Sequence, residues 1–400
     1  SAAYHLCEEY DLDVRVLEAG HIGWGASGRN GGFCSIGGHK LTDKALLRNF
    51  GLDATKQYYK SQVEAIELVA ELIDKENIQC DCVGDVGIEI ACSSKHFKSL
   101  KNHVDFQNKK LGLDSKLLEK EQIVEKYFDF PLNYGGVIAS PTFGLHPLKF
   151  IRGLSKAVKK RGASLHSQCE VKKWQKTGDI HHLSGDWGTL KAKKVVIATN
   201  GFTPEFIHKN LDGITLPMIS AIIVTRPLTA TEMRIHKWQT DSPAITDLNL
   251  LDYFRMLPDG SFLFGGRGSS DGSPIESEKN FVRLRARFNT VFPGWADIEI
   301  KYQWHGLICL TSRLTPAIGS FVDDPSVVFG FGYHGNGVNT ATWAGKQLAR
   351  LLVTNRSYFN ENPDWLPNIV YGMPQKFPFP KLRLKYVQAS ICMASLADKI

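Results

Sequence analysis

One glycine-rich segment near the N-terminus combines a permissive backbone with side chains that donate hydrogen bonds. Residues 23–32 read Gly-Trp-Gly-Ala-Ser-Gly-Arg-Asn-Gly-Gly, so half of them are glycine. Glycines let the backbone approach a ligand and point successive N–H groups toward it. Ser27, Arg29 and Asn30 add donors suited to phosphate oxygens or polar ring edges. A mobile surface loop is the alternative, which Trp24 and the crowding of donors make less attractive.

A second glycine-rich segment precedes a predicted helix in the C-terminal part of the chain. Four glycines occur among eight residues that start at Gly330, in the order Gly-Phe-Gly-Tyr-His-Gly-Asn-Gly. The pattern that follows predicts a helix over about 339–352. The first turn of a helix has unpaired N–H groups and the positive end of the helix dipole. The segment therefore predicts a site that stabilises negative charge, because a simple strand-to-helix turn would not require so many glycines.

The N-terminal residues resemble the second half of a nucleotide-binding βαβ unit. Residues 3–10 have helical periodicity, and a short β-rich strand at 14–17 ends at Glu18. In such units a first strand with a G-x-G-x-x-G turn precedes the helix, and the acidic residue binds the ribose. We expect this chain to lack that first strand, because no capping residue or turn precedes the helix. For Glu18, an acid that simply ends an exposed strand is the alternative.

The rest of the chain alternates α/β patterns with antiparallel ones. Helical periodicity covers 42–76, 94–111 and 148–158. Strands of the buried type are predicted at 193–197 and 327–332, and strand character is also expected at 80–91, 164–167 and 169–171. A Pro-Asp-Gly turn at 258–260 joins alternating segments, which predict an antiparallel sheet from 221–226, 250–256 and 261–266. The α/β block at the N-terminus and the second block at 148–201 are expected to share one parallel sheet.

Composition and charge exclude several classes of protein. The 400 residues are 43% hydrophobic and 22% charged, which is typical of a compact globule with two domains. The net charge of +7 is mild, and a solvated helix end explains the basic cluster at 156–161, so nucleic acid binding is not expected. No run approaches the roughly 18 apolar residues of a membrane span, and no signal sequence is recognisable, so a cytoplasmic location is expected.

The eight cysteines are expected to be reduced thiols. They include no C-x-x-C pair and no histidine partners at zinc-finger spacing, so no metal site is predicted. Cys80 and Cys82 are two residues apart, and a strand would place both on one face. Two small, half-buried residues are a sufficient explanation for that spacing.

Taken together, the motifs resemble those of the FAD-dependent amine and amino-acid oxidoreductases of the D-amino-acid oxidase and glycine oxidase type. The resemblance spans essentially the whole chain, and it rests on the order and spacing of the segments 25–32, 198–201, 250–255, 302–306 and 332–338. It implies an α/β fold, in which a Rossmann-type FAD-binding domain with a parallel sheet is interleaved with an α+β substrate domain containing an antiparallel sheet. The expected FAD-binding domain comprises 1–78, 147–212 and 322–358. The expected substrate-binding domain comprises 79–146 and 213–321. Residues 359–400 are expected to form a C-terminal extension that packs on the fold.

The resemblance also implies which residues contact FAD. Glu18 would bind the adenosine ribose, and Val171 would hold adenine through its backbone. Ser27, Gly28, Arg29 and Asn30 are expected near the pyrophosphate and flavin. The further residues expected to bind the cofactor are Ala26, Gly31, Gly32, Ala198, Thr199 and Gly201. The residues expected beside the isoalloxazine are Gly332, Gly335, Asn336, Gly337 and Val338, where a helix N-terminus would stabilise the anionic reduced flavin. No cysteine stands in the turn at 330–337, so noncovalent FAD is predicted.

The candidates for the substrate pocket are Tyr253, Arg255, Trp304, His305 and His334, with His146 as a further histidine of the same kind. Tyr253 and Trp304 could equally be core aromatics, and His305 could be a surface histidine. Glycine oxidase-like members carry an arginine that clamps a carboxylate where this chain has Ile308, with Arg313 farther along, which favours an amine over an α-amino acid. Sarcosine oxidase-like members carry a lysine where this chain has Asn339.

The expected reaction is oxidation of a C–N bond by hydride transfer to flavin, followed by hydrolysis of the imine and reoxidation by O2 to give hydrogen peroxide. A dehydrogenase that passes electrons to a quinone or carrier is one alternative. A non-catalytic flavin-binding module is the alternative from another class. The substrate identity and the oligomeric state stay open.

Overall fold

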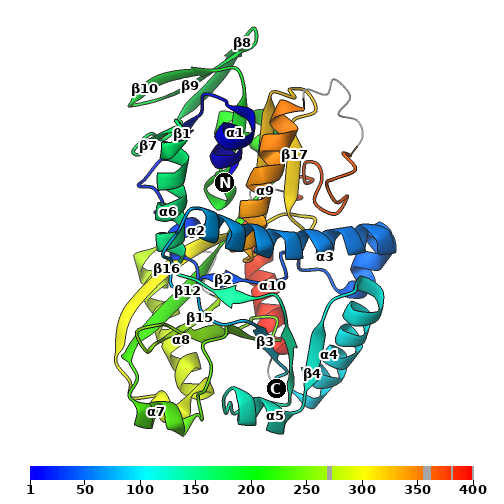
Figure 1. The fold of residues 1–400 in the computed structure, drawn as a ribbon, viewed down its shortest axis with the longest axis vertical. Coiled ribbons are helices and arrows are strands. Elements are labelled where there is room, and N and C mark those ends of the chain that lie inside the picture. The colour runs from blue at the N-terminus through cyan, green and yellow to red at the C-terminus, as the bar shows by residue number, and fades with distance from the viewer. Residues whose placement is uncertain (268–272, 355–361, 380–381, 399–400) are drawn as a thin grey trace.

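The computed structural model describes residues 1–267, 273–354, 362–379 and 382–398. Figure 1 shows two parts, with the long helix α3 (Asp43–Lys75) lying across the molecule between them. The fold is mixed α/β, as the sequence predicted, and contains both parallel and antiparallel strands. Parts of the expected ranges 322–358 and 359–400 lie outside the described residues.

The upper part in Figure 1 consists of small sheets and the helices packed on them. β1 (Arg15–Leu17) pairs in parallel with β7 (Ser164–His166), and α1 (Ala2–Tyr10) packs on α6 (Pro147–Lys160) and α9 (Gly337–Val353). β11, β18 and β17 form a second sheet, in which β11 is parallel to β18; their bounds are Val195–Ile197, Val327–Phe331 and Ala317–Ser320. A third, antiparallel sheet has the order β10-β9-β8, with bounds Gly188–Ala192, Ile180–Gly185 and Lys173–Thr177.

Two expectations about these sheets need correction. The α/β blocks at the N-terminus and at 148–201 were expected in one parallel sheet. β1 of the first block does pair in parallel with β7 of the second, but within the described ranges no backbone ladder joins this pair to β11, which pairs with β18 in another sheet. Residues 169–171 form no strand; the Cys169 N–H instead donates to the Glu18 carbonyl at 2.8 Å as the chain passes from β7 to β8. The helices expected at 3–10, 42–76, 148–158 and 339–352 are all confirmed.

The lower part is an eight-stranded sheet with the order β16-β12-β15-β14-β13-β3-β5-β4. In that order the strands span Ile300–Leu310, Leu216–Pro227, Ser261–Arg267, Tyr253–Met256, Ala244–Thr246, Gly87–Ile90, Gly136–Ala139 and Ser115–Leu118. β14 and β15 pair antiparallel across the Pro-Asp-Gly turn, which confirms the predicted hairpin. One face packs against α8 (Pro274–Val291) around an aromatic core that includes Phe254, Phe262 and Phe292.

Strand character at 80–91 is confirmed only for β3. Asp81 and Gly84 have positive φ values of 54° and 74°, so the backbone before β3 turns instead of extending. Cys80 and Cys82 therefore lie in a loop and not on one face of a strand.

α3 begins at an N-cap, Thr42, whose side chain accepts a hydrogen bond from the Ala45 N–H. Gly51 interrupts it with φ 79° and ψ 173°, a conformation that favours glycine, so two helical segments meet at a kink. The buried side of the longer segment includes Tyr58, Gln62 and Ile66 and packs on α9.

The remaining elements connect these parts. The helices are α2 (Ala26–Arg29), α4 (Ser94–Phe106), which continues as a π-helix at Gln107–Leu111, α5 (Lys120–Lys126), α7 (Ala230–Ile235) and α10 (Arg383–Ala397). β2 (Phe33–Cys34) pairs with β6 (Phe143–Gly144), and short 3-10 turns span Asn200–Phe202, Glu205–Ile207, Lys209–Leu211 and Pro293–Trp295. Among the described residues, no helix is long and apolar enough to cross a membrane.

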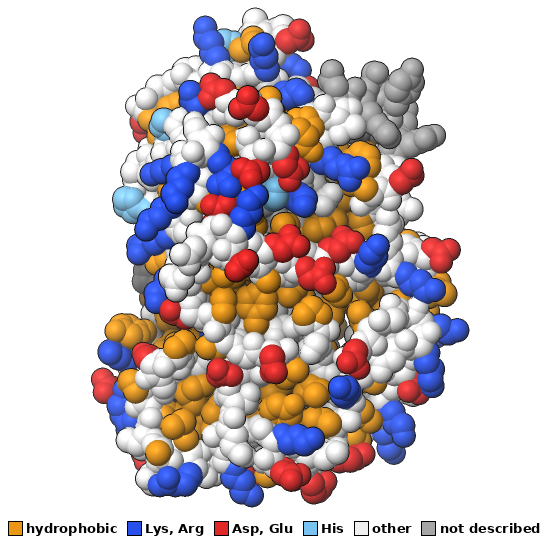
Figure 2. All heavy atoms as spheres, viewed as in Figure 1, with side chains coloured by type: hydrophobic (Ala, Val, Ile, Leu, Met, Phe, Trp, Pro, Cys, Tyr) orange, Lys and Arg blue, Asp and Glu red, His pale blue; other side chains and the backbone are white. Residues whose placement is uncertain are grey.

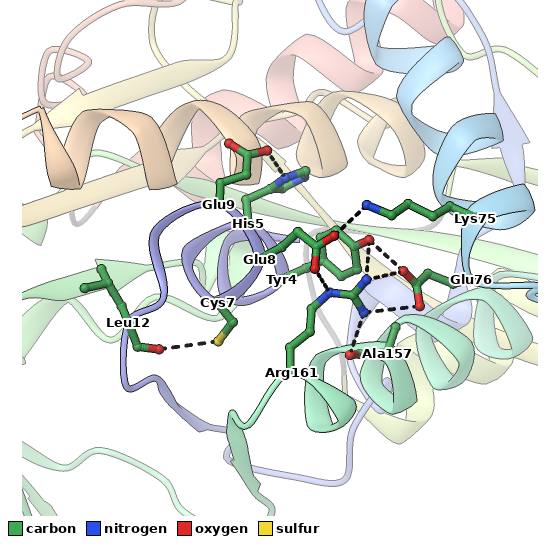
Figure 3. A network of polar contacts seen from close by, with 10 residues as sticks. All are labelled: Tyr4, His5, Cys7, Glu8, Glu9, Leu12, Lys75, Glu76, Ala157 and Arg161. Atoms are coloured by element: carbon green, nitrogen blue, oxygen red, sulfur yellow. Dashed lines mark hydrogen bonds and ion pairs between the residues drawn. The ribbon is translucent and has the colours of Figure 1, made fainter.

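An ionic network joins α1 to the C-terminal ends of α3 and α6 (Figure 3). Arg161, at the end of α6, bonds both carboxylate oxygens of Glu76, the carboxylate of Glu8 and the hydroxyl of Tyr4. The Tyr4 hydroxyl in turn donates to Glu76 at 2.6 Å, and Lys75 pairs with Glu8 at 2.6 Å. These contacts fix the C-terminal ends of α3 and α6 against α1.

Candidate functional site

The glycine-rich loop is held in shape by its own residues. Asn30 donates from Nδ2 to the carbonyl oxygens of Ala26 and Ser27 at 3.0 and 3.1 Å, and its Oδ1 accepts the Gly32 N–H at 2.8 Å. A Cβ at Gly28 would lie 2.1 Å from the Gly23 carbonyl oxygen, so only glycine fits there. Ser27 is exposed, and the structure records no hydrogen bond for its hydroxyl within the described ranges. The loop thus keeps a free donor on a fixed backbone.

Arg29 and Trp304 attach this loop to the eight-stranded sheet. The Trp304 Nε1–H donates to the Arg29 carbonyl at 2.8 Å, and Arg29 Nη1 donates to the His305 carbonyl at 3.4 Å. The Arg29 guanidinium lies 4.5 Å from the ring centroid of Trp24. Trp304 therefore positions the loop as well as lining the sheet.

Arg255 holds the next part of the loop. Its Nε donates to the Gly31 carbonyl at 2.9 Å and its Nη2 to the Leu145 carbonyl at 2.7 Å. The Leu145 N–H donates back to Gly32, whose φ is 75°. Arg255 is 2% exposed, and burial lowers its pKa to about 10, so it remains a cation at neutral pH. Its Nη1 has no hydrogen-bond partner among the described residues.

The second glycine-rich segment meets two other segments at the start of α9. The Gly332 N–H donates to Asn200 Oδ1 at 2.9 Å, which ties the segment to the turn at 198–201. Asn336 and Asn339 both donate to the Ser35 carbonyl, at 2.8 and 3.0 Å. The N-cap Asn336 makes no side-chain cap, so the first N–H groups of α9 keep their capacity to bind an anion.

His334 lies inside this turn as a neutral histidine. It is 3% exposed, has φ 50°, and its Nε2 lies 3.4 Å from the Thr311 hydroxyl. Burial lowers its pKa to about 3, so the ring is uncharged at physiological pH. Its Nδ1 has no partner among the described residues, which leaves one ring nitrogen for a ligand or water.

The other predicted cofactor residues lie at the edges of this region. The Glu18 carboxylate accepts the Gly20 N–H at 2.8 Å, and the segment that leads to Val171 passes beside it through the Cys169 bond to the Glu18 carbonyl. Ala198 and Thr199 are exposed. Gly201 approaches β16, where a Cβ would lie 3.4 Å from Leu307. Gly335 is exposed, and Gly337 and Val338 are half-buried in the first turn of α9.

One row of side chains crosses the eight-stranded sheet on the face that meets the loop. Cross-strand pairing places in that row Trp304, Ile222, Gly265, Tyr253, Ile245 and Glu89. Tyr253 touches the loop through Phe33, with ring centroids 5.7 Å apart, and its hydroxyl lies 2.8 Å from the Ser220 hydroxyl. Burial raises the pKa of Tyr253 to about 12, so its phenol stays protonated. Figure 2 shows apolar side chains gathered on the lower half of the visible face.

Glu89 is a residue of this row that sequence reasoning missed. Its neighbours Ile88 and Ile90 point into the aromatic core on the opposite face, whereas Glu89 is half-buried. The structure records no hydrogen bond or ion pair for its carboxylate within the described ranges, and burial raises its pKa. The nearby histidine His103 is already paired with Asp43. A glutamate in an alternating strand looks solvent-facing in a sequence, so only the register could reveal its position.

The structure does not bring His305 together with the other pocket candidates. His305 lies on the opposite face of the sheet from Trp304, where its ring faces Phe281 of α8 at 6.3 Å. Arg313 is also committed elsewhere, because it donates to the carbonyl oxygens of Tyr371, Val370 and Pro316 at 2.6–3.0 Å. His146 caps α6 by accepting the Lys149 N–H at 3.4 Å.

The fold and these features define a nucleotide-cofactor protein, in which glycine-rich turns and a free helix N-terminus adjoin one face of a large sheet. The family model described as FAD dependent oxidoreductase, DAO, matches residues 1–351. The chain belongs to this family of FAD-dependent oxidoreductases, and its cofactor is FAD. The free Ser27 hydroxyl, the glycine backbone that no Cβ could enter and the uncapped start of α9 fit such a group.

Relatives and solved structures agree with this family. The chain is 29% identical to a probable oxidoreductase OrdL of Haemophilus influenzae over 88% of this chain and 80% of that protein. It is 27% identical to the gamma-glutamylputrescine oxidoreductase of Escherichia coli over 100% of this chain and 90% of that protein. Its fold is similar to that of glycine oxidase from Geobacillus kaustophilus, with a TM-score of 0.71, 18% identity and coverage of 90% and 92%. The fold is also similar to that of L-proline dehydrogenase from P. horikoshii, with a TM-score of 0.73, 18% identity, and coverage of 90% of this chain and 91% of that one.

Proposed function

We propose that this protein oxidises the C–N bond of an amine at noncovalently bound FAD, with O2 as the final electron acceptor. The observation that carries the proposal is the junction of the glycine loop, the start of α9 and the Tyr253 row. FAD supplies an acceptor for the hydride from the carbon next to nitrogen. Loss of this hydride would convert the C–N bond of the neutral amine to an imine, after loss of a proton, and water would then hydrolyse the imine to a carbonyl product and an amine. The protein's part is to orient the neutral amine and exclude water.

The proposed cofactor contacts follow the geometry of the three segments. Glu18 and Val171 would hold the adenosine end, and the loop from Ala26 to Gly32 the pyrophosphate. The N–H groups of Gly337 and Val338 would stabilise negative charge on the reduced flavin. Burial raises the pKa of Cys309, which neighbours the turn, to about 12 and so disfavours the thiolate that a covalent link requires. Acid precipitation should therefore release all of the FAD from the protein.

An amine is favoured over an α-amino acid because no arginine stands at the position where glycine oxidase-like members carry their carboxylate clamp. Ile308 occupies that position, and three backbone carbonyls engage Arg313. Glu89 adds a carboxylate to the row that contains Tyr253, two strands away, at roughly 10 Å between Cα atoms. A gamma-glutamylputrescine-like amine or a diamine thus fits better than glycine. The eight free cysteines support a reducing, cytoplasmic location.

Substitution of Glu89 by Gln tests this part of the proposal. If the carboxylate holds a distal ammonium, KM for putrescine should rise roughly ten-fold, and KM for butylamine should not change. Initial rates with both amines would measure this, with Glu121→Gln, an exposed acid on α5, as the matched control. Equal KM values for putrescine in the wild type and Glu89→Gln would contradict a role for this residue.

Turnover in air tests the reaction and the acceptor together. The full-length natural protein, supplied with an amine, should form carbonyl product and hydrogen peroxide in equal amounts. Carbonyl product that appears only with an added quinone or dye would favour the dehydrogenase alternative. That alternative is supported by Asn339, whose Nδ2 is bound to Ser35 where related oxidases carry a lysine. No product with either acceptor would favour a non-catalytic flavin-binding module.

A further inference from the structure

Cys80 and Cys82 form a thiol pair outside the site described above. Their Sγ atoms are 3.6 Å apart, within hydrogen-bonding range for sulfur. Asp81 between them has φ 54°, a left-handed conformation that turns the chain and brings the two side chains together. The Asp81 carboxylate is fixed by Lys149 of α6 at 2.6 and 2.8 Å. The turn is therefore held in the shape that keeps the sulfurs close.

The two sulfurs differ in access and in acidity. Cys82 is exposed, whereas Cys80 is 2% exposed. The hydrogen bond from Cys80 lowers the pKa of the Cys82 thiol to about 7, and the same bond raises the pKa of Cys80. The Cys82 thiol therefore loses its proton at a lower pH than an ordinary cysteine, and the thiolate is the form that oxidants attack. An accessible thiolate with a second thiol beside it has the arrangement of an attacking and a resolving cysteine.

We propose that Cys80 and Cys82 are a peroxide-reactive pair that forms an intramolecular disulfide. The Cys82 thiolate attacks hydrogen peroxide, the O–O bond breaks, and sulfur gains one oxygen while hydroxide leaves. The Cys80 thiol then forms the S–S bond and displaces that oxygen as water. Two electrons pass from the two sulfurs to the peroxide, which ends as two waters once the hydroxide takes up a proton. The sulfurs must approach from 3.6 Å to about 2.0 Å, which a loop outside any strand permits.

The position of the pair links it to the cofactor loop. Val83, the next residue, exchanges two backbone hydrogen bonds with Gly144, at 2.7 and 2.9 Å, and the Cys80 carbonyl accepts the His146 N–H at 2.7 Å. Leu145, between these two contacts, is the residue that Arg255 and Gly32 bind. Oxidation would also remove the negative charge of Cys82, which acts on the buried Arg255. The pair thus lies directly behind the segment that braces the flavin loop.

Differential alkylation of the natural full-length protein tests the proposal. The tryptic peptide 76–95 contains Cys80, Cys82 and Cys92. After treatment with hydrogen peroxide and quenching, we expect this peptide to lose two hydrogens and to carry one alkyl group instead of three. Fragmentation should place that group on Cys92, and dithiothreitol should restore all three. Three alkyl groups after peroxide, or irreversible oxidation of Cys82 with Cys80 still alkylated, would overturn the proposal.

Two variants make the result specific to the pair. In Cys80→Ser, Cys82 should accumulate as the sulfenic acid and react with dimedone, because the resolving thiol is gone. Cys392→Ser, at an exposed cysteine of α10, should form the 80–82 disulfide as the wild type does. If Cys80→Ser fails to fold, the wild-type peptide still decides. Loss of the disulfide in Cys392→Ser would show that another cysteine is the partner and would overturn the assignment.

Discussion

Arg161, which is half-buried, and Arg255, which is buried, both join distant segments of the chain, but their surroundings are opposite. Arg161 meets two carboxylates and a phenol, and the hydrogen bonds to Glu8 and Glu76 raise its pKa above the ordinary arginine value against the effect of burial. Arg255 meets only the carbonyl oxygens of Gly31 and Leu145, keeps Nη1 unpaired within the described ranges, and has a lowered pKa. The guanidinium of Arg161 is fully hydrogen-bonded within the protein. The guanidinium of Arg255 keeps one nitrogen without a hydrogen-bond partner among the described residues.

We infer from this difference that Arg161 is structural, whereas Arg255 belongs to the proposed site. A satisfied ionic network fixes helices and can be replaced only as a whole, because removal of one partner leaves a buried charge. A buried cation with an unpaired N–H group beside a glycine-rich loop can donate a hydrogen bond to a ligand, and such groups cluster at functional sites. We therefore expect substitution of Arg161 to lower stability, and substitution of Arg255 to lower flavin binding more than stability.

The largest effect on stability is expected for Arg161→Ala. It leaves Glu76, whose side chain is 8% exposed, without its cation, so the free energy of unfolding should fall by about 3 kcal/mol. Urea unfolding would measure the change. Lys75→Ala is the matched control, since Lys75 is 56% exposed and its pair with Glu8 should contribute below about 1 kcal/mol. Similar losses in both variants would contradict a special role for the buried pair.

Arg255→Met should lower flavin binding more than it lowers the free energy of unfolding, which is the reverse of what we expect for Arg161→Ala. The loss of hydrogen bonds to two carbonyls is partly offset because a buried, incompletely paired cation is removed, so about 1–2 kcal/mol of stability should be lost. Without the brace on Gly31, however, the flavin-to-protein absorbance ratio should fall several-fold. Arg161→Ala at the same folded fraction should retain its flavin. Full flavin content in Arg255→Met would remove the contrast between the two arginines.

His334 provides a pH test of the same region. Its folded pKa of about 3 lies below the ordinary 6.5, so the unfolded chain binds the proton more tightly and stability is lost as pH falls from about 6.5 toward 3. At pH 5 its contribution to that loss should be about 2 kcal/mol. His334→Asn, which tolerates the φ of 50°, should flatten this part of the profile. The exposed His166→Asn is the control, and an unchanged profile in His334→Asn would contradict a buried neutral ring.

The smallest effect is expected for Tyr4→Phe. The variant removes one hydroxyl that donates to Glu76 and accepts from Arg161, and it keeps both charges paired. The free energy of unfolding should fall by about 1 kcal/mol. Chemical denaturation would measure it, and a loss as large as that of Arg161→Ala would mean that the phenol, and not the ion pair, holds the network together.

Local sequence signals predicted more of the fold than of the site. The glycine-rich loop, the strand before Glu18, the helix at 42–76 and the hairpin at 258–260 follow from periodicity and turn residues, and the structure has all of them. Glu89 was missed because its position depends on cross-strand register, which no local pattern encodes. His305 was grouped with Trp304, although alternation along β16 puts the two on opposite faces. The paired thiols of Cys80 and Cys82 depend on one left-handed residue, Asp81, that no turn motif announces.

The most direct test of the central claim is an anaerobic titration of the full-length natural protein. Its absorbance spectrum should show flavin bands near roughly 370 and 450 nm, which are typical of bound flavin. Putrescine or gamma-glutamylputrescine, added without oxygen, should bleach the band near 450 nm, and glycine should leave it unchanged. Flavin bands that no amine bleaches would contradict amine oxidation at this site.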